Sequence, residues 1–154
     1  MTLFFVGDVM QHAPQITAAL GTQQFKTYNY LPCFQYIQPY WEKADYVLAN
    51  LETTLSDRNF SGYPQFCAPW QLASDIKQRR SRDILTTNNN HSCDKGENGI
   101  RKTIYYLDSL EIPHIGTYTD TYHVLPPHVN CGLNIFQAVP PGRAEPRAQQ
   151  RPGL

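Results

Sequence analysis

The chain has 154 residues, of which 41% are hydrophobic and 17% charged, and its formal net charge at pH 7 is +0. This length and composition predict one folded domain with a buried core. The balanced charge argues against a general nucleic-acid-binding protein, because such proteins usually carry a basic excess. No apolar run in the sequence approaches the roughly 20 residues that a membrane-spanning helix needs.

The N-terminal segment, residues 1–6, is too short for a signal peptide, lacks a basic start and leads directly into a Gly-Asp pair. The four cysteines lie far apart and form no CxxC pair: Cys33, Cys67, Cys93 and Cys131. Such spacing predicts free thiols in a reducing compartment rather than a disulfide framework or a zinc knuckle. The sequence as it stands therefore predicts a cytoplasmic protein.

Strand-like and helix-like segments alternate along the chain. Residues 3–6 end at a glycine and predict a buried parallel strand. A proline in the first turn predicts a helix over 14–20, and apolar residues at helical spacing predict a helical segment over 32–41. Residues 46–49 predict a second strand. Residues 56–69 are rich in Gly, Pro and aromatic residues, and predict a structured loop.

A short helix is predicted over 70–77 and a third strand over 84–87. A further strand is predicted over 113–116. Strands that alternate with helices in this way predict an α/β fold with a mostly parallel sheet.

The helix between the last two strands has the clearest pattern. Ile100, Ile104 and Leu107 repeat at i, i+4 and i+7, as on the buried face of an amphipathic helix. Asp94 and Glu97 have the spacing of a capping box, which predicts that Asp94 caps the helix.

The composition changes near residue 122, where the apolar periodicity fades and prolines and arginines accumulate. This change predicts a domain over residues 1–121, followed by a divergent and disordered Pro/Arg-rich tail over residues 122–154.

Polar side chains follow the first two predicted strands. Asp8 ends the first strand, and Asn50 and Glu52 end the second. Open parallel sheets bind ligands at the carboxyl ends of their strands, and carboxylate and imidazole groups are common ligands of divalent metals. We expect a metal site here, with His12 reaching the same ion from the next loop. The competing interpretation is a turn or cap role for Asp8 and a solvated strand end for Asn50 and Glu52.

The turn after the third predicted strand carries the strongest chemistry. The Asn90 amide oxygen is a reasonable metal ligand beside carboxylates. His91 is a candidate general acid for a leaving group, and Asp94 is placed to orient its ring. Cys93 is a weaker candidate as a thiol nucleophile, because adjacent side chains diverge and no second base is evident. Residues 61–66 either line this site or form a packed aromatic loop.

These segments together resemble the bacterial capsule-synthesis protein family (CapA, poly-gamma-glutamate synthesis). The matching stretches follow the family's order and spacing: residues 7–12, 44–52, 61–64, 89–96 and 112–117. The resemblance covers residues 1 to about 121. It implies half of the α/β/β/α sandwich of the calcineurin-like metallophosphatase superfamily, with a mostly parallel sheet.

The resemblance also implies roles for single residues. Asp8 and His12 would bind one metal ion, Glu52 would bridge two ions, and Asn90 would bind the second. The implied cofactors are divalent Mn, Zn or Fe ions, two of them in an intact relative. His91 and Asp94 correspond to a His–Asp pair in which the histidine assists the leaving group.

The chain departs from the family pattern in two places. Residues 77–82 read Lys-Gln-Arg-Arg-Ser-Arg, where the family usually has a glycine before the strand. The family's second half brings further histidine ligands, and His123 and His128 do not match those motifs.

We therefore expect a truncated member of the family that is a metal-dependent phosphoester hydrolase if it is active. The alternatives are a non-catalytic accessory protein in the synthesis or export of an anionic polymer, and an inactive fragment. The expected partners are polymer-synthesis or export machinery, and not nucleic acid. Intact relatives are often membrane-anchored or extracytoplasmic.

Overall fold

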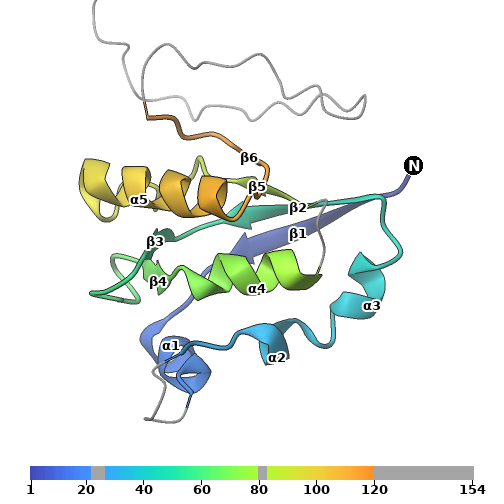
Figure 1. Cartoon of the computed structure of the whole chain (residues 1–154), viewed down its shortest axis with the longest axis horizontal. Coiled ribbons are helices and arrows are strands. Elements are labelled where there is room, and N and C mark those ends of the chain that lie inside the picture. Colours follow the sequence, from blue (N-terminus) through green and yellow to red (C-terminus); the bar gives the residue numbers. More distant parts are fainter. Residues whose placement is uncertain (22–26, 80–82, 120–154) are drawn as a thin grey trace, which may run out of the picture.

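The computed structural model describes residues 1–21, 27–79 and 83–119 (Figure 1). Its centre is a four-stranded sheet in the order β1-β2-β5-β6, and every neighbouring pair is parallel. The strands are β1 (Leu3–Val9), β2 (Tyr46–Leu51), β5 (Ile84–Thr86) and β6 (His114–Ile115). The predicted α/β fold with a mostly parallel sheet is confirmed, and it is consistent with part of a metallophosphatase-like domain.

The register of the sheet brings polar strand ends to one edge. Asp8 lies opposite Asn50 across β1 and β2, after an irregularity in the ladder between Val6 and Asp8. Thr86 of β5 lies opposite Asn50 on the other side. Because all four strands run in the same direction, the residues that follow them meet at the carboxyl edge of the sheet.

A second, two-stranded parallel sheet lies beside the first. It consists of β3 (Thr54–Ser56) and β4 (Cys67–Pro69). The prediction of a loop over 56–69 was wrong at both of its ends. Strands of three residues are too short to show a period of two, and the chain between them is a loop as predicted.

Five helices complete the described part of the chain: α1 (Ala13–Ala19), α2 (Leu31–Phe34), α3 (Gln38–Trp41), α4 (Gln71–Arg79) and α5 (Gly96–Ser109). The single helical segment predicted over 32–41 is two short helices. Each has a proline at its start, Pro32 in α2 and Pro39 in α3. A proline has no backbone N–H and clashes with the preceding turn, so Pro39 begins a new helix instead of continuing the first.

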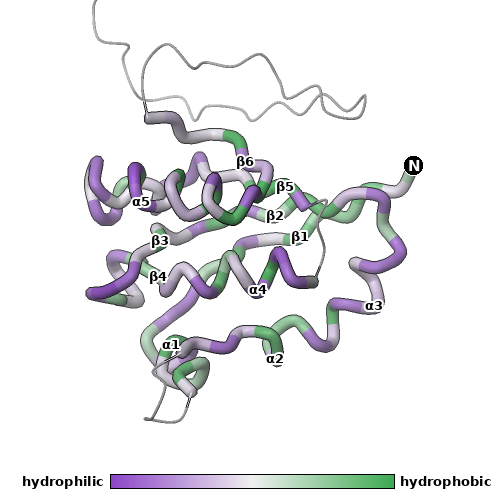
Figure 2. Tube along the Cα trace, viewed as in Figure 1, coloured by the Kyte–Doolittle hydropathy of each residue, from purple (hydrophilic) through white to green (hydrophobic). Residues whose placement is uncertain are grey.

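The helices α4 and α5 pack side by side. The rings of Trp70, just before α4, and Tyr106 of α5 are stacked with centroids 5.9 Å apart. Lys77 Nζ also donates a hydrogen bond to the carbonyl oxygen of Leu110. Figure 2 shows hydrophobic and hydrophilic residues alternating along α5, as expected for a helix with one buried face. Leu107 on this face is 0% exposed.

Three of the cysteines are free thiols, Cys67 being buried and Cys33 and Cys93 exposed. No helix in the described part of the chain is long and apolar enough to cross a membrane. Residues 80–82, Cys131 and the Pro/Arg-rich segment 122–154, for which a disordered tail was predicted, lie outside the described residues.

Candidate functional site

Two carboxylates and an amide meet where β1 and β2 end. Asn50 Nδ2 donates hydrogen bonds to Asp8 Oδ1, at 2.9 Å, and to Glu52 Oε2, at 3.0 Å. Asn50 and Glu52 point to one side because they are two residues apart on an extended backbone. The structure therefore brings together Asp8 and Glu52, two of the residues that the sequence suggested as metal ligands.

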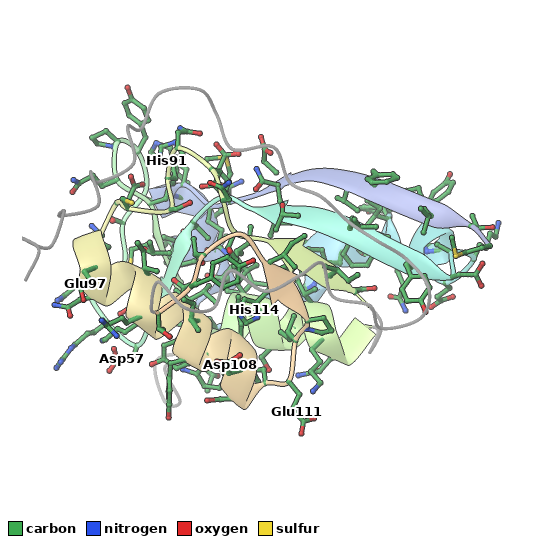
Figure 3. All side chains as sticks on the ribbon, turned by 90° about the horizontal axis from the view of Figure 1, so that it is seen from above. Asp57, His91, Glu97, Asp108, Glu111 and His114 are labelled. Carbon is green, nitrogen blue, oxygen red and sulfur yellow. The ribbon has the colours of Figure 1, made fainter. Side chains whose placement is uncertain are left out.

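A histidine–aspartate pair faces these carboxylates from the turn before α5 (Figure 3). His91 Nδ1 lies 2.8 Å from Asp94 Oδ2, and His91 Nε2 lies 4.0 Å from Glu52 Oε1. An ionised carboxylate only accepts hydrogen bonds, so Nδ1 carries the proton in this contact. The other ring nitrogen, Nε2, is therefore the atom presented to the carboxylates. The side chains of His91, Asp94 and Glu52 are 16%, 12% and 13% exposed, so the pair is mostly shielded from solvent.

The aromatic loop between β3 and β4 holds this pair in place. The backbone N–H of Phe66 donates to Asp94 Oδ2 at 2.6 Å. The Phe66 ring meets the His91 ring edge to face, with centroids 4.6 Å apart. Within the loop 61–66, Phe66 thus contacts the site, and its buried ring also packs against Tyr63, so that both alternatives left open by the sequence apply to this residue. Sequence reasoning did not single out Phe66, because an aromatic residue in a loop carries no mark of what it packs against.

The side-chain amide of Asn89 joins the strand end that carries Asn50 and Glu52 to the turn that carries His91. Asn89 Nδ2 donates to Asn50 Oδ1 at 3.0 Å and to the carbonyl of Leu51 at 2.9 Å. Its Oδ1 accepts the backbone N–H of His91 at 3.0 Å. The side chain of Asn89 therefore orients the Asn50 amide with its nitrogen toward the carboxylates. Asn90, which the sequence suggested as a metal ligand, is exposed.

His12 begins the first helix. Its Nδ1 accepts a hydrogen bond from the backbone N–H of Ala13 at 2.8 Å, and Gln15 Oε1 in turn accepts the backbone N–H of His12, which completes a capping box. The His12 ring also meets the Phe66 ring edge to face at 6.4 Å. In the described structure its Nδ1 is therefore used by the helix cap, which leaves Nε2 as its remaining ring nitrogen.

The prediction that Asp94 caps α5 was wrong. The N-cap residue is Lys95, and no side chain caps the helix there. The carboxylate of Asp94 instead accepts hydrogen bonds from His91 and from the backbone of Phe66. The helix begins later than the capping-box spacing implied, because residues 91–96 form turns before it.

Comparison with known proteins gives the family. The sequence profile of the bacterial capsule synthesis protein PGA_cap matches residues 2–130, which include all of the site residues. The chain belongs to this family. The profile match runs past residue 121, where the domain was predicted to end.

A curated relative agrees with the family assignment. The capsule biosynthesis protein CapA of Bacillus anthracis is 24% identical over an alignment of 141 residues. The match covers 84% of this chain and 32% of that protein. The chain thus spans about a third of the length of this curated relative.

In this capsule synthesis family member, Glu52 holds its proton more tightly than an ordinary glutamic acid. Burial raises the pKa of the Glu52 carboxyl, and the neighbouring Asp8 carboxylate raises it further, while the His91 ring opposes the shift. The two effects differ in origin but act in the same direction, because each penalises a negative charge placed at this position.

This raised pKa predicts a pH-dependent effect of Glu52→Gln. The folded state binds the Glu52 proton more tightly than the unfolded state, so stability is lost as pH rises from the unfolded to the folded pKa. Glutamine keeps an oxygen for Asn50 Nδ2 and removes the charge. We expect thermal unfolding at pH 7, without metal, to show a melting temperature a few degrees higher for the variant.

The control is the same measurement at a pH below the unfolded pKa. There both side chains are neutral, and the two melting temperatures should coincide. A variant that is less stable than the parent at pH 7 would contradict the role of burial and of Asp8.

The donor set fits one divalent cation better than two. Asp8 and Glu52 offer the carboxylate oxygens that such ions prefer, and the raised pKa of Glu52 shows that its charge is poorly compensated. Within residues 1–21, 27–79 and 83–119, no group of three or more His, Cys, Asp and Glu side chains is placed to hold a metal ion. The described residues thus offer two carboxylates, fewer donors than a tightly held ion normally has.

Proposed function

We propose that this capsule synthesis family chain carries part of a metal-dependent phosphoester hydrolase site. The observation that supports it is the mostly shielded His91–Asp94 pair, whose Nε2 lies 4.0 Å from Glu52 Oε1. The exposed carboxylate of Asp8 is joined to Glu52 through Asn50. A polarised histidine next to paired carboxylates is the arrangement expected of acid catalysis beside an ion-binding position.

The proposed role of His91 is that of general acid. Asp94 accepts the hydrogen bond from Nδ1 and so keeps Nε2 directed toward the substrate position. In the protonated ring, Nε2–H donates its proton to the leaving oxygen as water attacks the phosphorus and the bond from phosphorus to that oxygen breaks. Phe66 supports the step indirectly, because its ring and its backbone N–H fix the positions of His91 and Asp94.

Asp8 and Glu52 are the residues proposed to hold a divalent ion, Mn, Zn or Fe. Such an ion supplies positive charge for the phosphoryl oxygens and lowers the pKa of a bound water. In the absence of an ion, Asn50 Nδ2 compensates part of the charge of the two carboxylates through its two hydrogen bonds.

Metal binding in this chain is expected to be weak and to depend on Asp8. Two carboxylates are fewer ligands than a tightly held ion normally has. We expect Mn²⁺ to raise the melting temperature only at a large excess of ion, because the gain grows with the logarithm of the ratio of ion concentration to Kd. Asp8→Asn should abolish this gain.

Asp108→Asn is the matched control, since this carboxylate lies on α5, is 68% exposed and is separated from His91 (Figure 3). Retention of two metal ions per chain through dialysis, measured by elemental analysis, would contradict the expectation of weak binding to a single site.

A second candidate function is binding without turnover, as an accessory protein in polymer synthesis or export. The incomplete set of metal ligands favours it. The two functions are separated by an assay of a generic phosphomonoester and phosphodiester with added Mn²⁺, because only the hydrolase turns them over.

A further inference from the structure

A hollow apart from the His91 site opens in the described part of the chain. It has a volume of about 390 Å³ and lies between β3 and the first half of α5. None of Asp8, Glu52, His91 and Asp94 lines it. It is separated from the His91 site by the pairing of β3 with β4, and Thr54 Oγ1 donates to the Phe66 carbonyl across this wall at 2.9 Å.

Four basic side chains gather around this hollow: Arg58, Lys95, Arg101 and Lys102. Two have acidic partners. Lys102 Nζ lies 2.6 Å from Asp57 Oδ1, and Arg101 contacts Glu97 Oε1 at 2.8 Å. Figure 3 shows Asp57 and Glu97 near the start of α5, away from His91. No ion pair of the described residues involves Arg58 or Lys95.

The charged side chains around the hollow therefore carry a net positive charge. Four cations against two carboxylates leave a formal excess of two positive charges in a chain whose formal net charge is +0. Ser56, Asn59 and Asn98 add polar side chains to the lining, and the rest of the lining is formed by Thr54, Leu55, Cys67 and Gly99. Guanidinium and ammonium groups beside hydroxyls and amides are the donors that proteins use for phosphate and carboxylate groups.

We propose that this hollow is an anion-binding site for a doubly charged ligand group, a phosphate or a dicarboxylate. The formal excess of two positive charges favours a ligand group of opposite charge, and the basic residues supply its hydrogen bonds. The proposal concerns binding alone and does not depend on the proposed hydrolysis. It would give this chain a contact for an anionic ligand apart from the Asp8–His91 site.

The test is a titration of the full chain with two dianions, inorganic phosphate at pH 8 and glutarate, followed by ¹H–¹⁵N NMR at low salt. We expect saturable shifts of backbone amides at residues 54–59 and 95–102, weakened by added salt. If only one of the two ions gives saturable shifts, the ligand group is of that chemical class, a phosphate or a dicarboxylate. The absence of saturable shifts with both ions, or shifts confined to other residues, would overturn the proposal.

Variants add an independent check. The double variant Arg58→Gln, Lys95→Gln should bind about tenfold more weakly, since each exposed ion pair contributes modestly. Asp57→Asn should bind about two- to fivefold more tightly, because it removes the carboxylate that neutralises Lys102. Lys43→Gln, an exposed charge outside the hollow, should bind as the parent does.

Equal affinity of the double variant and the parent would overturn the proposal. The spectra of the variants without ligand report whether they fold. If the double variant does not fold, the change in anion affinity caused by Asp57→Asn tests the proposal instead. Weaker or unchanged binding by Asp57→Asn would overturn the proposal.

Discussion

His91→Ala is expected to lower phosphoester hydrolysis by about 10²- to 10⁴-fold, the usual effect of losing a general acid. Alanine removes the ring nitrogen that lies 4.0 Å from Glu52, and leaves the carboxylates of Asp8 and Glu52 in the chain. The measurement is the initial rate with a generic phosphomonoester or phosphodiester and added Mn²⁺. Circular dichroism of the variant checks that the loss is not caused by unfolding.

Cys93→Ala is the matched control, because Cys93 lies in the same turn and its side chain is exposed. It should keep most of the parent's rate, since the proposed proton transfer does not use the thiol of Cys93. If Cys93→Ala is the inactive variant, thiol catalysis replaces the mechanism proposed for His91.

Asp94→Asn tests the positioning role of the carboxylate. Asparagine can present its N–H₂ to His91 Nδ1, which reverses the tautomer and places the proton on Nε2 of the neutral ring. We expect a lower rate and a changed pH–rate profile, which a purely structural role of Asp94 would not produce. A parent chain without activity on either substrate would remove the hydrolase proposal and leave binding without turnover.

Leu107→Ala is expected to cost about 2–5 kcal/mol of the free energy of unfolding, the range found for buried leucines that leave a cavity. Leu107 is 0% exposed and belongs to the same core as Leu85 of the central sheet and Leu72 of α4. Alanine keeps the helix propensity high, so the loss reports packing rather than helix formation. Urea unfolding measures the change.

Tyr105→Ala on the same helix is the control. Tyr105 is 64% exposed, so its truncation removes little buried surface, and we expect a change below about 1 kcal/mol. Similar losses for the two variants would show that α5 does not pack against the sheet through the Leu107 face.

The parallel sheet could be predicted from the sequence because its causes are local. The apolar runs of β1, β2 and β5 are bounded by polar residues, and the helical repeat of α5 lies between β5 and β6. Strand ends of parallel strands must meet at one edge, so the proximity of Asp8 and Glu52 followed from the order of elements alone. The short strands β3 and β4 could not be predicted from the sequence, because three residues are too few to show the alternation of a strand.

The roles of individual side chains at the site depended on contacts between distant parts of the chain. The carboxylate of Asp94 has the spacing of a helix cap, yet it accepts the N–H of Phe66, which lies 28 residues earlier. Three consecutive asparagines precede His91, and only the packing of the turn against β2 selects Asn89 to hold Asn50. The sequence by itself determined the elements and the edge where they present polar groups, since both follow from local periodicity. Tertiary structure alone decided which donor meets which acceptor, because a hydrogen bond depends on positions within a few tenths of an ångström that local patterns do not set.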